Sequence, residues 1–323
     1  MTDQAPFAKT GSWSVPEELR EVRLDFFAHR CLPHLSRRAL QSAIREKLFW
    51  INDKAGRKGD KLTAGDQLVF KGPAHWLMPQ PLADPKLQVP IVYEDATIMV
   101  LDKPAGVATH GFSARDALTL ANFLMAQRPE LSTVGKSRWE SGLVHRLDRE
   151  TSGLVLVAKS RAAFDSLRLQ FSRREIKKIY WALVWGNAEA EGVIDYPLAH
   201  DSRDPRRMRA LMAPNTRRKA VRRWPALTRF RKLCRRRGLS LLEVEMESGV
   251  THQIRVHLAA VGHPIVADAL YGAPGAETFG LDRHFLHARS LQFRHPETDR
   301  VIKVEAELPA QLKEVLKRLK MTF

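Results

Sequence analysis

The stretch GLVHRLDRETSGLVLVAKS, residues 142–160, combines an apolar run with a cluster of charges. Residues 153–158 are apolar and partly β-branched, which indicates a buried strand. Asp148 precedes this strand, with Arg146 and Arg149 on either side. A carboxylate in such a turn is usually structural, because it accepts backbone N–H bonds. Nearby cations would nevertheless keep Asp148 ionised, as a nucleophile or a general base must be.

Short apolar segments bounded by glycine or charge recur on both sides of this stretch. Strands are predicted within residues 91–110, 141–147, 153–159, 179–186, 239–246 and 284–293, and helices over 117–127, 161–171, 252–261 and 309–320. The strands outnumber the helices and do not alternate with them. The sequence therefore predicts an α+β fold with a mixed but mainly antiparallel sheet.

The charge of the chain indicates a polyanionic partner. Among 323 residues, 53 Lys and Arg stand against 36 Asp and Glu, which gives a formal net charge of +17. A membrane-binding protein would show a basic amphipathic helix or a long apolar span, and neither is evident. Nucleic acid is therefore the favoured partner. Two cysteines and no apolar leader at the start predict a soluble protein of the cytoplasm.

Five prolines between Gly72 and Ile91 predict an extended linker over residues 73–90. The predicted order is an N-terminal extension (1–19), a small module (20–72), the linker, and a catalytic domain (91–323). In the module, Ser36 can cap a helix whose apolar positions are Leu40, Ile44 and Leu48. Three exposed cations on this helix are either a solvated surface or an RNA contact: Arg37, Arg38 and Arg45.

Residues 20–72 resemble a small α/β RNA-binding module first described in a ribosomal small-subunit protein, on the pattern VRLDFFAHRCLPHLSRRALQSAIREKLFWIND. The resemblance implies that Arg37, Arg38 and Arg45 contact RNA phosphates. Asn52-Asp53 stands where that family often has Asn-Gly, so the turn after the strand is expected to differ.

A second basic region lies between residues 201 and 240, where fifteen Lys or Arg accompany two acids. Such a local excess of positive charge favours contact with phosphates. The alternative is that its tripeptide Arg235–Arg237 is only the tip of a hairpin beside Gly238. Phosphate contacts supply affinity and register, but they do not specify a base sequence.

The segment SGVTHQIRVHLAAVGHPIVAD, residues 248–268, predicts a helix capped by Thr251. His252 and Arg255 share one side near its N-terminus, where an aspartate or a phosphate would suit both; they are otherwise an ordinary surface pair. No HExxH spacing, Gly-rich phosphate loop or GxSxG elbow occurs. We therefore predict neither a metal nor a cofactor.

Several motifs in this order resemble those of the RluA-type RNA pseudouridine synthases. They are VYEDATIMVLDKPAGVATH, GLVHRLDRETSGLVLVAKS, REIKKIYWALVWG, SGVTHQIRVHLAAVGHPIVAD and LHARSLQFRHPETDRVIKVEAELP, and they cover about residues 88–312. The resemblance implies that uridine in RNA is isomerised to pseudouridine after the base has flipped out of its helix. Members with an N-terminal RNA-binding module typically act on large-subunit ribosomal RNA, so that RNA is the expected target and transfer RNA the next.

The resemblance also implies roles for single residues. Asp148 lies at the catalytic aspartate, Tyr180 at the tyrosine that stacks on the target base and assists proton removal, and Arg255 at the arginine that pairs with the aspartate. Arg146 lies where the family presents an arginine to the space that the flipped uridine leaves. Three neighbouring residues are also expected to contact RNA: His145, Arg149 and His252.

Val250 departs from the family pattern, which has an arginine in the tripeptide before Thr-His-Gln. This substitution is expected to remove a phosphate contact and to leave the catalytic groups intact. The chain is expected to act as a monomer. Two other functions remain open: a catalytically weak RNA-binding factor in ribosome assembly, and a nucleosidase that releases free base.

Overall fold

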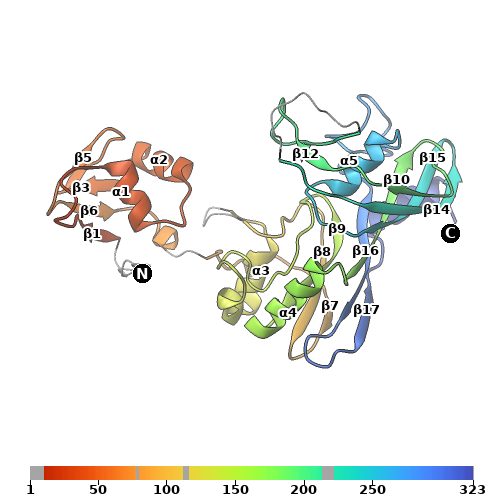
Figure 1. Ribbon diagram of the computed structural model, residues 1–323, viewed down its shortest axis with the longest axis horizontal. Helices are drawn as coiled ribbons and strands as arrows, with labels where there is room; N and C mark the ends of the chain where they lie inside the picture. Colours follow the sequence, from red (N-terminus) through yellow and green to blue (C-terminus); the bar gives the residue numbers. More distant parts are fainter. Residues whose placement is uncertain (1–10, 78–79, 112–115, 213–221, 323) are drawn as a thin grey trace. The chain divides into compact units, whose positions relative to one another are not determined.

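A computed structural model of the protein describes residues 11–77, 80–111, 116–212 and 222–322. The chain divides into two compact units (Figure 1), and each is considered by itself. The first unit comprises residues 1–84 and 111–117, and the second comprises residues 85–110 and 118–323. In the described residues, no helix has both the length and the apolar character needed to cross a lipid bilayer.

The described residues of the first unit form two α-helices and two small antiparallel sheets. The helices are α1 (Leu24–Cys31) and α2 (Arg37–Arg45). One sheet consists, in spatial order, of β1 (Ser12–Ser14), β6 (Gln67–Phe70), β3 (Phe49–Ile51) and β4 (Lys54–Ala55). The other sheet pairs β2 (Val22–Arg23) with β5 (Lys61–Leu62). Ser36 caps α2 as expected, since its hydroxyl accepts the Ala39 N–H at 3.2 Å. Leu48 lies beyond the helix, which ends at Arg45.

The small module is larger than residues 20–72. Strand β1, within the expected N-terminal extension, pairs with β6. At the other end, Ala74–Leu77 form the 3₁₀ helix η1, and the buried Trp76 stacks on Phe70 with 5.8 Å between ring centroids. Strand pairing and aromatic packing, which the composition did not reveal, thus order parts of the predicted extension and linker.

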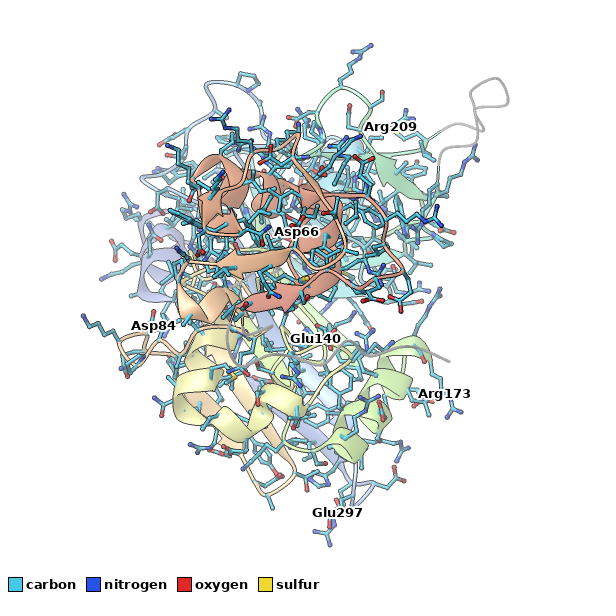
Figure 2. All side chains as sticks on the ribbon, turned by 90° about the vertical axis from the view of Figure 1, so that its left-hand side faces the viewer. Asp66, Asp84, Glu140, Arg173, Arg209 and Glu297 are labelled. Carbon is cyan, nitrogen blue, oxygen red and sulfur yellow. The ribbon has the colours of Figure 1, made fainter. Side chains whose placement is uncertain are left out.

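The Asn52-Asp53 turn closes the β3–β4 hairpin with a positive φ at both residues, 44° and 68°. This is the left-handed conformation for which glycine is the favoured second residue. Asn52 compensates through its side chain, which donates to Asp66 at 2.6 Å and accepts the Gln67 N–H at 2.8 Å. Asp66 is labelled in Figure 2.

The second unit is built on a nine-stranded, mainly antiparallel sheet, which confirms the predicted α+β class. Its strands, in spatial order, are β11 (Glu191–Ile194), β14 (Thr228–Arg236), β15 (Leu239–Met246), β10 (Lys177–Trp185), β16 (Leu286–Arg294), β9 (Ser152–Ala158), β8 (Ile98–Lys103) and β7 (Ile91–Glu94), with β17 (Val301–Glu305) also paired to β16. The β16–β9 pair is parallel.

Helices and a separate two-stranded ribbon complete this unit. They are α3 (Leu120–Gln127), η2 (Pro129–Thr133), α4 (Arg161–Ser172), α5 (Gln253–Ala260), α6 (Ala310–Arg318), and the ribbon of β12 (Leu198–His200) and β13 (Met208–Ala210). Arg209 of β13 is labelled in Figure 2. Helices α3, α5 and α6 lie within the ranges that the sequence predicted, and α4 extends one residue beyond its range, to Ser172. The 3₁₀ helix η2 was not predicted.

Residues 141–147, predicted as a strand, form only an isolated bridge between Leu143 and Val157. The reason is that a side chain takes over the pairing: the Leu156 N–H donates to His145 Nε2 at 2.9 Å. Conversely, β14 was not predicted, because its exposed face is basic. Its Arg229 and Arg231 pair across strands with Glu247 (2.9 Å) and Glu243 (3.0 Å). Part of the basic excess of residues 201–240 thus has local partners.

Strand β9 provides rigid support for the turn that carries Asp148. All seven of its residues are buried, between β8 and β16. Its Gly153 has φ +114°, and a Cβ there would lie 2.3 Å from the carbonyl oxygen of Ala288. Only glycine allows so close a strand approach directly after the turn.

Candidate active site

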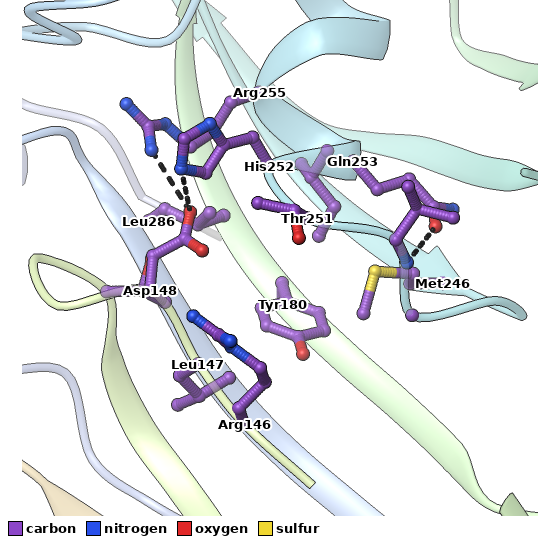
Figure 3. Close-up of a pocket in the computed structure, with 14 residues that line it drawn as sticks. Arg146, Leu147, Asp148, Tyr180, Met246, Thr251, His252, Gln253, Arg255 and Leu286 are labelled. Atoms are coloured by element: carbon purple, nitrogen blue, oxygen red, sulfur yellow. Dashed lines mark hydrogen bonds and ion pairs between the residues drawn. The ribbon is translucent and has the colours of Figure 1, made fainter. Parts of the chain in front are cut away.

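Segments far apart in the sequence meet around one open pocket of the second unit (Figure 3). Its walls come from the turn at residues 146–151, from Tyr180 of β10, from Met246 at the end of β15, from residues 249–255, and from Leu286 at the start of β16. Residues 146–148, Tyr180 and Arg255, which the sequence had related only through a family resemblance, therefore lie in one site.

Asp148 and Arg255 form an ion pair in this pocket. The Arg255 Nη1 donates to Asp148 Oδ2 at 3.0 Å, as Figure 3 shows. The side chain of Arg255 is 7% exposed and that of Asp148 is 19% exposed. A carboxylate that accepts a charged hydrogen bond from a fixed, buried guanidinium keeps one orientation. Asp148 is therefore prepared to act as a nucleophile or as a base.

Asp268 holds Arg255 from the other side. Arg255 Nε donates to Asp268 Oδ2 at 2.7 Å, and Nη2 donates to Oδ1 at 2.9 Å. Burial alone would raise the pKa of Asp268, but the hydrogen bonds and charge of Arg255 outweigh it and the pKa is lowered. The sequence analysis missed this residue, although Asp268 is the last letter of the motif that contains Arg255. Its spacing from Arg255 follows no local rule, so only the resemblance could have drawn attention to it.

His252 lies beside Asp148, with 3.9 Å between its Nε2 and Asp148 Oδ2. Its Nδ1 is 2.9 Å from the Tyr271 hydroxyl, which also accepts the Met208 N–H at 2.8 Å. Burial lowers the pKa of His252 in spite of the negative charge of Asp148. A neutral His252 is a wall of the pocket rather than a cation for phosphates.

The predicted cap of the following helix is wrong. His252, not Thr251, is the N-cap of α5; it has φ +56° and its side chain caps no backbone N–H. The left-handed backbone turns the His252 ring into the pocket, where Figure 3 places it beside Asp148. The sequence rule failed because the Tyr271 hydroxyl, from a distant segment, bonds this ring.

Tyr180 presents its ring to the pocket from the middle of the sheet (Figure 3). It pairs with Val244 of β15 and Ala288 of β16, and it is 4% exposed. Burial, and then the charge of Asp148, raise the pKa of its phenol. Tyr180 therefore carries its proton at neutral pH and presents an aromatic ring with a neutral hydroxyl.

The turn that carries Asp148 is held by buried polar side chains from two other segments. The Thr109 hydroxyl accepts the N–H of Leu147 at 3.0 Å and donates to its carbonyl at 2.9 Å. Lys103 Nζ donates to the carbonyl of Arg149 at 2.9 Å, and Arg283 donates to the carbonyl of Glu150 at 3.2 Å. The rings of His284 and His287 form hydrogen bonds with the hydroxyls of Thr151 (2.8 Å) and Ser152 (2.9 Å), respectively. Nearly every residue of the turn thus has a buried partner. Burial lowers the pKa of Lys103 to about 7.

The structure corrects one expected RNA contact. His145 accepts the Leu156 N–H and lies against Phe171, with 4.9 Å between ring centroids. Burial, followed by the charge of Lys178, lowers its pKa to about 3. A neutral histidine that bonds a strand does not attract phosphate, so His145 has a structural role.

The other expected contacts are accessible. Arg146 is exposed at the rim of the pocket near Asp148 and Tyr180 (Figure 3), and Arg149 is exposed on the far side of the turn. In the first unit, α2 presents three exposed arginines: Arg37, Arg38 and Arg45. None of these five forms an ion pair within the described residues.

Val250 packs on an apolar cluster. Together with Trp224 and Tyr271, it lies against a small buried group: Leu198, Met208, Ala226 and Val256. This group joins the β12–β13 ribbon to α5. The substitution that departs from the family pattern thus has a packing partner, and an arginine at this position would have to leave that cluster.

Comparison with known proteins places the chain among RNA pseudouridine synthases. Residues 97–260 match a family described as RNA pseudouridylate synthase. The ribosomal large subunit pseudouridine synthase D of Neisseria meningitidis serogroup B is 36% identical over 322 residues, which span 95% of this chain and 81% of that protein. An uncharacterized RNA pseudouridine synthase of Chloroflexus aurantiacus is 39% identical, over 94% of this chain and 92% of that one.

The fold also resembles solved structures. Human RNA pseudouridylate synthase domain containing 1 superposes with a TM-score of 0.56 and 26% sequence identity, over 74% of this chain and 98% of that one. Human RNA pseudouridylate synthase domain containing 4 superposes with a TM-score of 0.57 and 24% identity, over 72% and 94%.

Proposed function

The chain belongs to the RNA pseudouridylate synthase family, and we propose that it isomerises uridines of large-subunit ribosomal RNA in the cytoplasm, with Asp148 as the catalytic group. The protein is an RNA pseudouridine synthase, an isomerase. The choice of RNA is supported by relatives named ribosomal large subunit pseudouridine synthase D, from Neisseria, Nitrosomonas and Pseudomonas. The exposed cations of both units suit a polyanionic substrate.

The observation that carries the mechanism is the Asp148 carboxylate, held by Arg255 in the pocket that Tyr180 also lines. Isomerisation breaks the bond between the sugar and N1 of uracil, rotates the base, and forms a bond from the sugar to C5. The C5 proton leaves and N1 gains a proton. Asp148 assists either by attack on the anomeric carbon or by removal of the 2′ proton, and both routes require an oriented carboxylate.

The base must leave its helix to reach Asp148, because stacked neighbours cover the reacting atoms. Extrusion costs a few kcal/mol, which stacking partly offsets. Tyr180 supplies the face for the extruded uracil, and its protonated hydroxyl bonds the base rather than acting as a phenolate. Arg146, exposed at the rim, is placed to occupy the space that the base vacates.

The first unit is proposed to bind RNA through α2. Its arginines Arg37, Arg38 and Arg45 are exposed on one short helix, while its apolar residues Leu40 and Ile44 are buried. Basic side chains on one helix face contact phosphates without regard to sequence. This unit would raise affinity for RNA, while the second unit carries out the reaction.

The decisive experiment incubates transcripts of large-subunit ribosomal RNA with the wild type and with Asp148→Asn, and maps pseudouridine. The wild type should form pseudouridine and Asp148→Asn should form none. Asp299→Asn is the matched control, because that carboxylate is 82% exposed in the β16–β17 connection. Pseudouridine in transfer RNA alone would overturn the proposed target; release of free uracil would indicate a nucleosidase; no product on any RNA would indicate a binding factor.

A further inference from the structure

A second open pocket adjoins the one that contains Tyr180. The two share Asp148, His252 and Arg255 as a common wall. The remaining wall of the second pocket carries Arg149 and Arg283. A nucleotide whose base meets Tyr180 and whose ribose meets Asp148 would therefore extend its backbone toward these two arginines.

Arg283 is a buried cation on which the carboxylates of Asp282 and Glu150 act only from a distance. It is only 6% exposed, yet it makes one hydrogen bond, from Nη1 to the carbonyl of Glu150 at 3.2 Å. Within the described part of the chain, no carboxylate lies in ion-pair distance of its guanidinium. A guanidinium has five donors, and burying its charge without an anion is unfavourable. The other donors of Arg283 are available to an anionic acceptor in this pocket.

Arg149 provides a second cation for the same ligand. Its carbonyl is held by Lys103 Nζ and by the Gly106 N–H, which fixes the backbone next to Asp148. Its side chain is exposed and forms no ion pair in the portion of the structure that is described. Arg149 can therefore turn toward a ligand while its backbone keeps the turn in place.

Two carboxylates face the same pocket, which restricts the kind of anion. Glu150 and Asp282 line it, and the Asp282 carboxylate accepts a hydrogen bond from Gln311 at 3.2 Å. Because these carboxylates reduce the local positive charge, a free anion would bind only weakly in this pocket. A phosphodiester is different, because the contacts of its own nucleotide raise its effective concentration at the pocket.

We propose that Arg149 and Arg283 bind a backbone phosphodiester adjoining the target uridine, and so align its ribose with Asp148. This inference rests on the proposed function, since the ligand is the RNA of the pseudouridine reaction. It assigns one nucleotide to consecutive groups of the site: the base to Tyr180, the sugar to Asp148, and the phosphate to the arginines.

The test uses an RNA fragment that contains a uridine modified by the full-length wild type. A single neutral methylphosphonate replaces the phosphodiester on the 5′ or the 3′ side of that uridine. At one of these positions the wild type should lose about 10- to 100-fold in kcat/KM, the size expected for one charge-assisted contact. Arg283→Gln and Arg149→Gln should lose activity on the natural RNA and show little further loss on the methylphosphonate RNA.

The dependence of RNA affinity on salt gives a second readout. Removal of one phosphate contact should reduce the slope of log K against log salt by about 0.7. Arg283→Lys keeps the charge and should keep the slope. Arg300→Gln, which removes an exposed arginine directly before β17, is the control for charge loss and should keep the slope.

The outcomes separate this subsite from the proposed function. If the wild type modifies RNA but methylphosphonate penalises the wild type and Arg283→Gln equally, Arg283 only supports the turn and the subsite is wrong. If the wild type modifies no RNA, the proposed function fails, and the subsite fails with it. Should Arg283→Gln not fold, the exposed Arg149→Gln decides the same comparison.

Discussion

Asp268 accepts two parallel hydrogen bonds from Arg255, at 2.7 Å from Nε and 2.9 Å from Nη2, and Arg255 Nη1 donates to Asp148. The side chain of Asp268 is fully buried, so the orientation of Arg255 is set inside the protein. The Asp148 carboxylate is thus connected through Arg255 to a carboxylate that is fully buried. Arg255 therefore fixes the orientation of the Asp148 carboxylate.

We expect Asp268→Asn to lower kcat far more than it raises KM. Asparagine has one acceptor, and its amide hydrogens face the donors of Arg255, so the two parallel bonds cannot both form. A buried cation that loses its partner also costs about 3–5 kcal/mol of stability. Single-turnover rates and urea unfolding measure the two effects. An unchanged kcat, alongside an unchanged Asp299→Asn control, would refute this positioning role.

Arg255→Lys should reduce turnover by about 10- to 100-fold, the loss expected for charged hydrogen bonds, while the affinity for RNA changes little. Lysine keeps the charge, but its ammonium cannot reproduce the planar fork that spans two carboxylates. Turnover is measured at saturating RNA, and affinity is measured with the Asp148→Asn background to prevent reaction. Equal losses in both quantities would show that Arg255 binds RNA.

The ring and the hydroxyl of Tyr180 should contribute separately. Tyr180→Phe keeps a stacking face and should bind RNA normally, with a kcat lowered by about 100-fold, as for loss of a proton-transfer or hydrogen-bonding group. Tyr180→Leu loses the aromatic face and should also weaken binding of the flipped base. Because burial and Asp148 raise the pKa of the phenol, the wild-type rate should show no tyrosine inflection near neutral pH. Such an inflection, absent in Tyr180→Phe, would argue for a phenolate base.

His145 should make folding sensitive to acid without affecting RNA binding. Its pKa is about 3 in the folded chain and 6.5 in the reference state. Between these values the unfolded chain binds the extra proton, so stability is complete above pH 6.5 and declines as the pH falls toward 3. His145→Gln keeps an acceptor for the Leu156 N–H but does not titrate. Urea unfolding at pH 7 and pH 5 measures how much the free energy of unfolding falls with acid. This fall should be smaller in His145→Gln than in the wild type, by up to about 1.4 kcal/mol per pH unit.

The same His145→Gln variant should retain the salt slope of RNA binding. A reduced slope would restore His145 to the RNA contacts. His284 and His287, whose pKa values burial lowers to about 4, remain in the variant and provide the shared background of acid sensitivity.

The second unit should fold without the first. A chain of residues 85–323 retains the nine-stranded sheet and the Asp148 pocket. We expect a cooperative thermal transition, retained activity on short RNA, and weaker binding with a smaller salt slope, because Arg37, Arg38 and Arg45 are gone. A truncated chain that lacks a cooperative transition would mean that the first unit is part of the folding core.

The sequence alone determined the fold class and most elements, because periodicity and capping are local properties. Strand β9, helix α4 and helix α2 all form where apolar spacing placed them. It also pointed to Asp148, Tyr180 and Arg255, since each lies in a motif that keeps its order along the chain. Local patterns did not predict where a side chain replaces a backbone partner. His145 accepts a hydrogen bond from a backbone N–H of β9, and residues 141–147 therefore do not form the predicted strand.

Only the tertiary structure decided how these residues act together. Asp148 and Arg255 are 107 positions apart, and their 3.0 Å contact exists because β9, β10 and α5 converge on one pocket. The surroundings then set each charge: Arg255 lowers the pKa of Asp268 and keeps it ionised, whereas burial lowers the pKa of His145 and of His252 and keeps them neutral. The free energy of a charge depends on its surroundings in space, which residue spacing along the chain does not specify. The sequence thus supplied the proposed catalytic groups, and packing determined their partners.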